Sequence, residues 1–137
     1  MGIVLDSSVV IAAERRAETV SQFLKQILTK FGDQEAVLSS IGLVELAHGI
    51  HRAKTTEIRK QRQQFIHELL ADVSVYPFTT ELALLAGKID AEQQMSGVSI
   101  PFADLLIGAT ALALGYSVIT GNIRHFQKIP GLSVIQI

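Results

Sequence analysis

The sequence predicts an α/β fold with a mainly parallel central sheet of four to five strands flanked by helices. Short apolar segments rich in β-branched residues alternate with longer helical segments along the chain, a pattern typical of parallel sheets. Residues that start helices recur just after several of the short segments. The chain has 137 residues and shows no repeat or linker, so we expect a single domain spanning residues 1–137.

Hydroxyl residues mark where helices begin in the first part of the chain. A Ser or Thr at a helix start accepts a hydrogen bond from a backbone N–H group that lacks a partner inside the helix. Thr19 and Gln22 have the spacing of a capping box. The predicted elements are a strand Gly2–Leu5, a helix Val9–Arg16 capped by Ser7 or Ser8, a helix from Thr19 to near Gly32, a strand Ala36–Leu38, and a helix from Ser39 or Ser40 through Glu45.

Proline and glycine punctuate the rest of the chain. Pro101 is well placed as the first residue of an apolar helix, because its fixed φ and missing N–H suit that position. Gly115 ends this helix, and Pro130-Gly131 forms a later turn. The predicted elements are a helix Thr55–Leu70, a strand Val73–Tyr76, a helix from Thr79 or Thr80 to about Met95, the helix from Pro101 to Leu114, a strand Ser117–Thr120 and a candidate fifth strand Leu132–Ile137.

The composition bears on the class of function. The net charge is −1, so the chain has no overall positive potential that would attract a nucleic acid. A polyanion would have to be bound by a local basic patch or by a metal. The absence of cysteine rules out disulfides and thiolate metal sites and fits a reducing cytoplasm. No apolar run reaches the roughly 18 residues that span a membrane, and the N-terminus lacks the basic region of a signal peptide. We therefore expect a cytoplasmic protein with no membrane partner.

Three acidic residues stand alone in apolar sequence. Asp104 is the single charge in the run from Ile100 to Leu114 and has no basic residue near it. Asp6 follows the first predicted strand, and Glu45 is flanked by apolar residues on both sides. A carboxylate in such surroundings costs free energy unless something pairs with it. Three of them indicate one site around a hard cation.

The predicted topology brings these acids together. In parallel sheets, ligands bind outside the carboxyl ends of the strands. Asp6 lies at that end of the first strand, and Asn122 directly follows the fourth. Glu45 and Asp104 fall near the starts of helices, so we expect the four side chains to converge on one edge. Carboxylates without His or Cys select Mg²⁺, with Mn²⁺ as an alternative ion, and such a site suits phosphodiester hydrolysis.

Four motifs occur in order along nearly the whole chain. They are Leu5-Asp6-Ser7-Ser8, Val44-Glu45-Leu46-Ala47-His48-Gly49, Ala103-Asp104-Leu105-Leu106-Ile107-Gly108-Ala109, and Ile119-Thr120-Gly121-Asn122-Ile123-Arg124-His125-Phe126. Together they resemble the PIN-domain ribonucleases, and more narrowly the VapC-type toxins of bacterial type II toxin–antitoxin pairs.

The resemblance implies a PIN-like three-layer fold and Mg²⁺-dependent endonucleolytic cleavage of RNA. It also implies a homodimer and a VapB-type antitoxin as partners. It assigns catalysis and metal binding to Asp6, Glu45 and Asp104. Ser8 and Thr120 match residues that orient these acids by hydrogen bonds, and Asn122 is a further supporting residue.

The sequence departs from the family where many members carry a fourth acid. Asn122 stands near that place, and His125 occupies a position where another acid often occurs. Three carboxylates favour one firmly bound Mg²⁺ over a permanent second ion. The departure leaves an alternative open: a catalytically weak PIN-like module that binds nucleic acid with its antitoxin as a repressor complex. A phosphohydrolase with Asp6 as nucleophile is a second alternative, although Ser8 replaces the acid that such enzymes usually have there.

Each singled-out residue also has a purely structural interpretation. Asp6 could cap the first helix, Asp104 could pair with Arg124 or another distant base, and Asn122 could serve only as a turn residue. A basic segment has two interpretations as well, as a solvated helix face or as a rim that steers RNA phosphates. The residues assigned to such a rim are Arg52, Lys54, Arg59 and Arg62.

Overall fold

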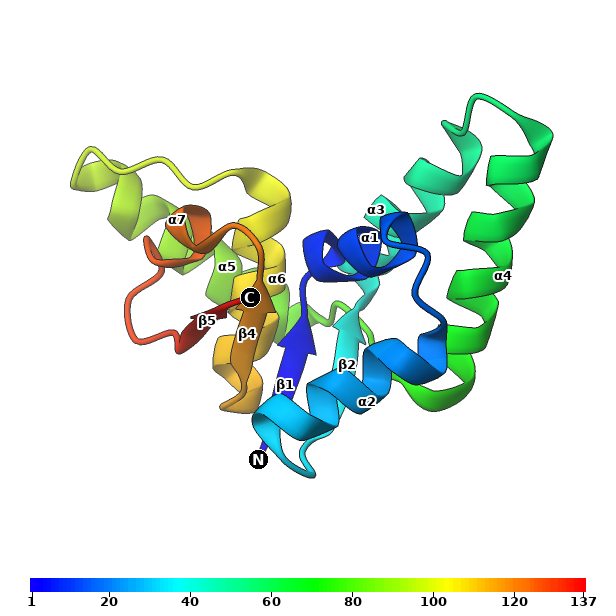
Figure 1. Cartoon of the computed structure of the whole chain (residues 1–137). Helices are drawn as coiled ribbons and strands as arrows, with labels where there is room; N and C mark the ends of the chain where they lie inside the picture. The colour runs from blue at the N-terminus through cyan, green and yellow to red at the C-terminus, as the bar shows by residue number, and fades with distance from the viewer.

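A fully parallel sheet forms the centre of the molecule in the computed structural model, which describes residues 1–137 (Figure 1). Its order is β3-β2-β1-β4-β5, and every neighbouring pair is parallel. The strands are β1 (Gly2–Leu5), β2 (Glu35–Ser39), β3 (Ser74–Tyr76), β4 (Ser117–Thr120) and β5 (Val134–Gln136). The sheet confirms the predicted fold class, and β1 is its central strand.

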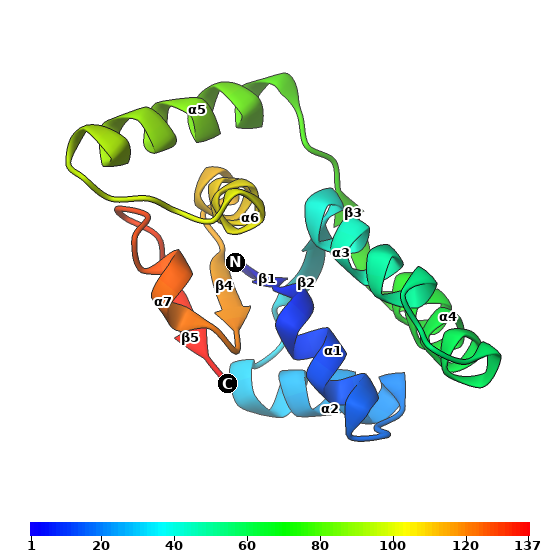
Figure 2. The ribbon, with the colours of Figure 1, turned by 90° about the horizontal axis from the view of Figure 1, so that it is seen from above.

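Helices cover both faces of this sheet (Figures 1 and 2). They are α1 (Ser7–Arg15), α2 (Val20–Phe31), α3 (Ser40–His51), α4 (Thr56–Asp72), α5 (Thr80–Met95), α6 (Phe102–Leu114) and α7 (Ile123–Phe126). Helices α1, α2 and α4 pack on one face, and α5, α6 and α7 on the other. None of them combines the length and apolar character that a bilayer-crossing segment requires.

Side chains alternate along β1 and build a separate core on each face. Ile3 and Leu5 pack in a cluster that contains Phe23 of α2. Val4 packs on the opposite face in a cluster that contains Ile107 of α6. These three residues of β1 are at most 1% exposed. Burial on both faces explains why β1 is a continuous apolar run rather than an alternating one.

The helix starts follow the predicted hydroxyl signals except at α1. Thr19 and Gln22 form a complete capping box, with Gln22 N donating to Thr19 Oγ1 at 3.1 Å and Thr19 N to Gln22 Oε1 at 2.9 Å. At α1 the prediction that Ser7 or Ser8 is the cap is wrong, because the helix begins at Ser7 with Asp6 in the capping position. The Asp6 side chain makes no capping hydrogen bond either, and both serine hydroxyls donate to carboxylates.

Two helix boundaries and one short helix also differ from the predictions, and several strand ends shift by one or two residues. Helix α3 continues past Glu45 to His51, because no residue in between stops it. Pro101 is the capping residue of α6 rather than its first helical residue, since its ψ of 135° is extended. The short helix α7 was not predicted, and it is held by Phe126, whose side chain is fully buried.

Gly108 allows α6 to approach the segment that follows α7. A Cβ built at Gly108 would lie 2.2 Å from Cδ1 of Ile129, a residue that is 2% exposed. We expect Gly108→Val to lower the free energy of unfolding by about 2–3 kcal/mol through overpacking. At Gly87 in α5 a Cβ meets open space. Gly87→Val should therefore change the free energy of unfolding by less than about 0.5 kcal/mol. Denaturant unfolding measures both, and equal effects would contradict this packing role.

Candidate active site

Asp6 lies at the carboxyl end of the central strand and is held by two hydroxyls. Its backbone N–H donates to the carbonyl of Ile119 at 2.9 Å, which carries the β1–β4 pairing up to this residue. Asp6 is only 4% exposed. Its Oδ2 accepts hydrogen bonds from Ser8 Oγ at 2.6 Å and from Thr120 Oγ1 at 2.8 Å. The two donors engage Oδ2 only, so Oδ1 is left for a ligand.

The same two hydroxyls also fix the loop after β4. Thr120 Oγ1 accepts from the backbone N–H of Asn122 at 2.9 Å, and Ser8 Oγ accepts from that of Gly121 at 3.0 Å. Each hydroxyl thus donates to Asp6 and accepts from the loop. The ends of β1 and β4 are therefore locked together around one carboxylate.

Glu45 reaches the same edge from the second turn of α3. Ser7 Oγ donates to its Oε1 at 2.8 Å, which leaves Oε2 without a protein donor. Burial raises the pKa of the Glu45 carboxyl above its ordinary value. The bond from Ser7 opposes this, and the negative charges of Asp6 and Asp104 raise the pKa further. The three carboxylates thus lie close enough to repel one another.

Asp104 projects from the first turn of α6 and pairs with a histidine. Its Oδ2 lies 2.7 Å from Nδ1 of His125, so the distant base that pairs with it is His125 and not Arg124. Burial raises the pKa of Asp104. The hydrogen bond from His125 opposes that rise, the charge of Asp6 adds to it, and the charge of His125 again lowers the pKa. Imidazole thus partly compensates a carboxylate that burial and repulsion destabilise.

Asn122 contacts the other side of the same imidazole nitrogen. Its amide lies 2.9 Å from Nδ1 of His125. A nitrogen that donates its proton to Asp104 cannot accept a second one from an amide N–H. The tautomer with a proton on Nδ1 is consistent with both contacts when the amide oxygen of Asn122 faces the ring. Asn122 then helps to hold His125, and His125 holds Asp104.

The donor set fits a magnesium ion. No three carboxylate or imidazole groups are close enough to hold one ion directly. Mg²⁺, however, takes only one or two direct carboxylates and keeps several waters, through which a third acid can act. None of the three acids is paired with Lys or Arg. His125, which pairs with Asp104, is the one basic side chain in contact with them, and a divalent cation would supply the remaining positive charge.

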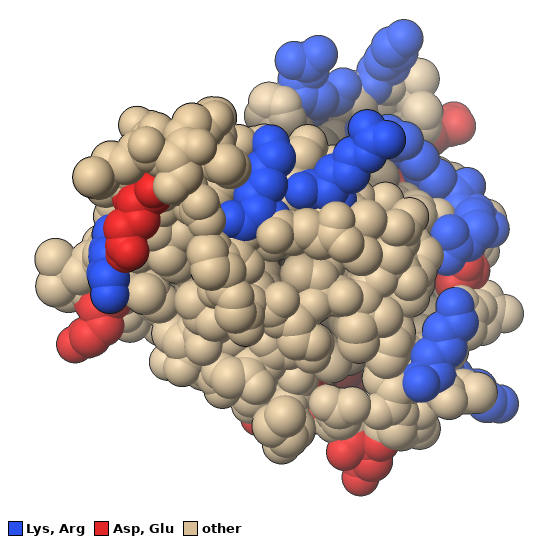
Figure 3. All heavy atoms as spheres, turned by 90° about the vertical axis from the view of Figure 1, so that its left-hand side faces the viewer, with Lys and Arg blue, Asp and Glu red and all other residues tan.

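Positive charge lies around this edge rather than within it. The strands point upward in Figure 1, and Lys and Arg side chains gather along the upper and right margins of the face in Figure 3. Arg52, Lys54 and Arg59 are exposed near the end of the α3–α4 hairpin, which projects beyond the carboxyl ends of the strands (Figure 1). No ion pair links these three predicted rim residues to the carboxylates.

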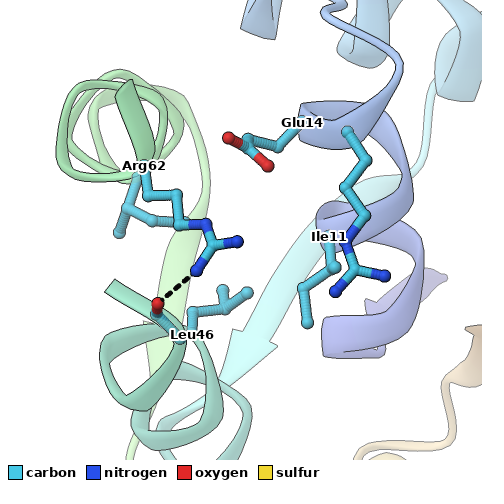
Figure 4. Close-up of a pocket in the computed structure, with 7 residues that line it drawn as sticks. Ile11, Glu14, Leu46 and Arg62 are labelled. Atoms are coloured by element: carbon cyan, nitrogen blue, oxygen red, sulfur yellow. Dashed lines mark hydrogen bonds between the residues drawn. The ribbon is translucent and has the colours of Figure 1, made fainter. Parts of the chain in front are cut away.

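Arg62, the fourth predicted rim residue, is placed differently. It lines a small cavity of about 70 Å³ between α1, α3 and α4, together with Ile11, Glu14 and Leu46 (Figure 4). Its Nη1 donates to the carbonyl of Gly49 at 2.6 Å. This bond ties α4 to α3, so in this structure Arg62 serves the packing of the hairpin.

Sequence reasoning assigned no site role to Ser7 and noted His125 only as a substitution for an acid. Ser7 was considered a helix cap, although the adjacent Asp6 already occupies that position. Nothing in the sequence signals that Ser7 reaches Glu45, because the two residues are 38 positions apart. The spacing of Asn122 and His125 across one helical turn is the one local signal that these two side chains meet.

Comparison with known proteins places this fold and site in a family. Residues 3–132 match the family model of the PIN domain. Ribonuclease VapC of Rickettsia bellii is 33% identical and Ribonuclease VapC1 of Rickettsia felis 31% identical, each over all of this chain and 97% of the relative. The crystal structure of VapBC2 from Rickettsia felis bound to a DNA fragment from its promoter superposes with a TM-score of 0.85. The two sequences are 25% identical, and the superposition covers 100% of this chain and 99% of that chain. The chain therefore belongs to the PIN-domain family and, within it, to the VapC ribonucleases.

The raised pKa values of Glu45 and Asp104 predict how stability depends on pH without metal. Such groups stabilise the fold below their unfolded pKa, and this contribution is lost as pH rises through their folded pKa. In EDTA, the free energy of unfolding should therefore fall as the pH rises from the unfolded pKa to the folded pKa of these groups. Glu45→Gln removes one charge but keeps an acceptor for Ser7, so it should flatten the slope and raise the neutral-pH Tm by about 2–4 °C.

Thermal melts across the acidic and neutral range test this expectation. The matched control is Glu57→Gln, the same change at an exposed position in the first turn of α4. It should leave the slope as in the wild type. A Glu45→Gln protein with an unchanged slope would show that the fold does not raise the pKa of Glu45.

Proposed function

We propose that this chain is a Mg²⁺-dependent endoribonuclease that hydrolyses phosphodiester bonds in RNA, with Mn²⁺ as an alternative ion. The observation that carries the proposal is the set of three acids at one sheet edge. Each is held by a hydroxyl or an imidazole of the chain, and none is neutralised by Lys or Arg. Membership of the VapC ribonucleases supports RNA as the substrate.

Asp6 and Asp104 are the residues that would hold the ion, directly or through water. When bound, Mg²⁺ stabilises negative charge on the scissile phosphate and makes water a better nucleophile. Ser8 and Thr120 keep Asp6 in one orientation, and His125 does so for Asp104. Because these carboxylates are already oriented, less free energy is needed to assemble the site in each turnover.

Glu45 is the residue we assign to proton transfer. Its Oε1 is held by Ser7, so Oε2 can accept the proton of the attacking water. A carboxylate with a raised pKa is a better base at neutral pH than an ordinary one. As the proton leaves, the water oxygen bonds to phosphorus and the bond from phosphorus to the leaving oxygen breaks.

Asp104→Asn tests the site directly. The change keeps the size of the side chain and an acceptor for His125 but removes the charge that would bind the ion. We expect cleavage of total and transfer RNA in Mg²⁺ to slow by at least about 100-fold, as it should when EDTA is added. The control Asp90→Asn makes the same change on α5, where the carboxylate accepts hydrogen bonds from Gln94. This variant should cleave RNA at the wild-type rate.

A folded Asp104→Asn protein that cuts RNA at the wild-type rate would show that the site lies elsewhere. A different outcome favours the second candidate function, a binding module that acts in a repressor complex. That candidate is motivated by Asn122 in place of an acid and by the DNA-bound neighbour. It requires that the wild type cut no RNA while its complex with an antitoxin binds DNA without metal.

We propose a VapB-type antitoxin and a second copy of this chain as protein partners. The proposal is supported by a structural neighbour that is a VapBC complex. It is also supported by large apolar side chains that remain exposed, among them Leu84 at 72%, Met95 at 87% and Phe102 at 72%. Apolar area of this kind is typical of surfaces that another chain covers.

The exposed cations of the α3–α4 hairpin should act on binding rather than on chemistry. The double change Arg52→Gln with Lys54→Gln removes two exposed charges between α3 and α4. We expect KM to rise with kcat nearly unchanged, and the slope of log affinity against log salt to fall by about 0.7 per lost phosphate contact. The control Lys88→Gln changes a residue of α5 paired with Glu92 and should alter neither quantity. Equal effects of both variants would argue against a role of the hairpin in RNA binding.

A further inference from the structure

Arg124 is a cation beside the carboxylate site that forms no ion pair within the protein. Its neighbour His125 holds Asp104, and Asn122 contacts the same imidazole. Arg124 itself is exposed and takes part in none of the ion pairs of the structure. Its guanidinium group is therefore available to a ligand of opposite charge.

The packing of α7 sets the direction in which Arg124 points. Phe126 is fully buried in the core cluster on this face of the sheet, and His125 points to Asp104. A helix turns by about 100° per residue, so Arg124 is about 100° from His125 and about 160° from Phe126 around the axis of α7. Its side chain therefore points away from the core and lies next to that of His125.

Arg124 is close to the site but does not face the carboxylates. Consecutive Cα atoms are about 3.8 Å apart, so its side chain starts one residue from the histidine that contacts Asp104. The ion and the cleaved phosphate would lie at Asp6 and Asp104, whereas Arg124 is exposed to solvent. Its position suits the phosphate that neighbours the cleaved one along the RNA strand.

Arg124 and the cations of the α3–α4 hairpin lie on opposite sides of Asp6. In the sheet, β1 lies between β2 and β4. Helix α3 starts directly after β2, and α7 follows the short loop after β4, so the two helices leave the sheet on either side of β1 (Figure 2). An RNA strand that contacts both the hairpin and Arg124 would pass over the end of β1, where Asp6 lies.

We propose that Arg124 binds the phosphate next to the cleaved one and thereby positions the RNA strand on the α7 side of the site. The proposal rests on the proposed ribonuclease function. A guanidinium group presents parallel N–H donors that match two phosphate oxygens. Lys keeps the charge but lacks this pair of donors, so charge and geometry can be tested separately.

Arg124→Gln should weaken RNA binding because it removes both the charge and the paired donors. We expect the Kd of a single-stranded RNA oligonucleotide and the KM of cleavage to rise about tenfold, with kcat changed by less than about twofold. The slope of log affinity against log salt should fall by about 0.7. Arg124→Lys should keep the wild-type slope and still raise Kd about two- to fivefold.

Fluorescence anisotropy of the oligonucleotide in EDTA, over a series of salt concentrations, measures binding without cleavage. The matched control Lys25→Gln removes one exposed positive charge from the outer face of α2 and should leave Kd, KM and the salt slope as in the wild type. Because Arg124 forms no ion pair in the protein, its variants should keep the wild-type Tm to within about 2 °C.

A single uncharged linkage in the oligonucleotide locates the contact. A methylphosphonate at a 2′-deoxy linkage next to the cleaved bond should raise the wild-type Kd about tenfold. In Arg124→Gln the same linkage should cause no further loss, because the two changes remove one interaction. Losses that simply add at every linkage would overturn the proposal.

Failure of this proposal and failure of the proposed function give different results. If the wild type cuts no RNA, the ribonuclease function fails, while a loss coupled to one linkage still supports phosphate binding by Arg124. If cleavage is normal but Arg124→Gln binds and cuts RNA like the wild type, the contact is wrong and the nuclease stands. A fall in kcat at unchanged KM would place Arg124 at the reacting phosphate and overturn its assignment to the neighbouring one. Weaker antitoxin binding with unchanged RNA binding would assign Arg124 to a protein contact and overturn the proposal as well.

Discussion

The structure depends on keeping one nearly buried carboxylate at the end of its central strand. Asp6 is 4% exposed, and a charge in such a place is costly unless hydrogen bonds compensate it. The compensation comes from Ser8 in α1 and Thr120 in β4, two elements far apart in the sequence. Because both hydroxyls also accept from the loop after β4, stabilising Asp6 and closing this edge of the sheet are the same interaction.

The other two acids are held in the same way, each by a side chain from another element. Ser7 of α1 holds Glu45 of α3, and His125 of α7 holds Asp104 of α6. The pKa of both acids is raised, first by burial and then by neighbouring charge. The fold thus stores unfavourable electrostatic energy at one edge, and a divalent cation is the partner that would release it. This is the physical reason that this edge is the proposed site of chemistry.

Substrate contacts are proposed to extend from this edge to the α3–α4 hairpin. The exposed cations of the hairpin can attract the phosphates of RNA, but charge alone cannot distinguish one base from another.

The sequence by itself determined the fold class and the strand positions, and it singled out the three acids of the proposed site. Apolar periodicity, capping residues and isolated charges are encoded within a few neighbouring residues, so they can be recognised without a structure. Only the tertiary structure decided that Ser7 holds Glu45 and that His125, rather than Arg124, holds Asp104. It alone revealed α7. Such pairings depend on strand register and helix packing, where a shift of one residue turns a side chain to another face.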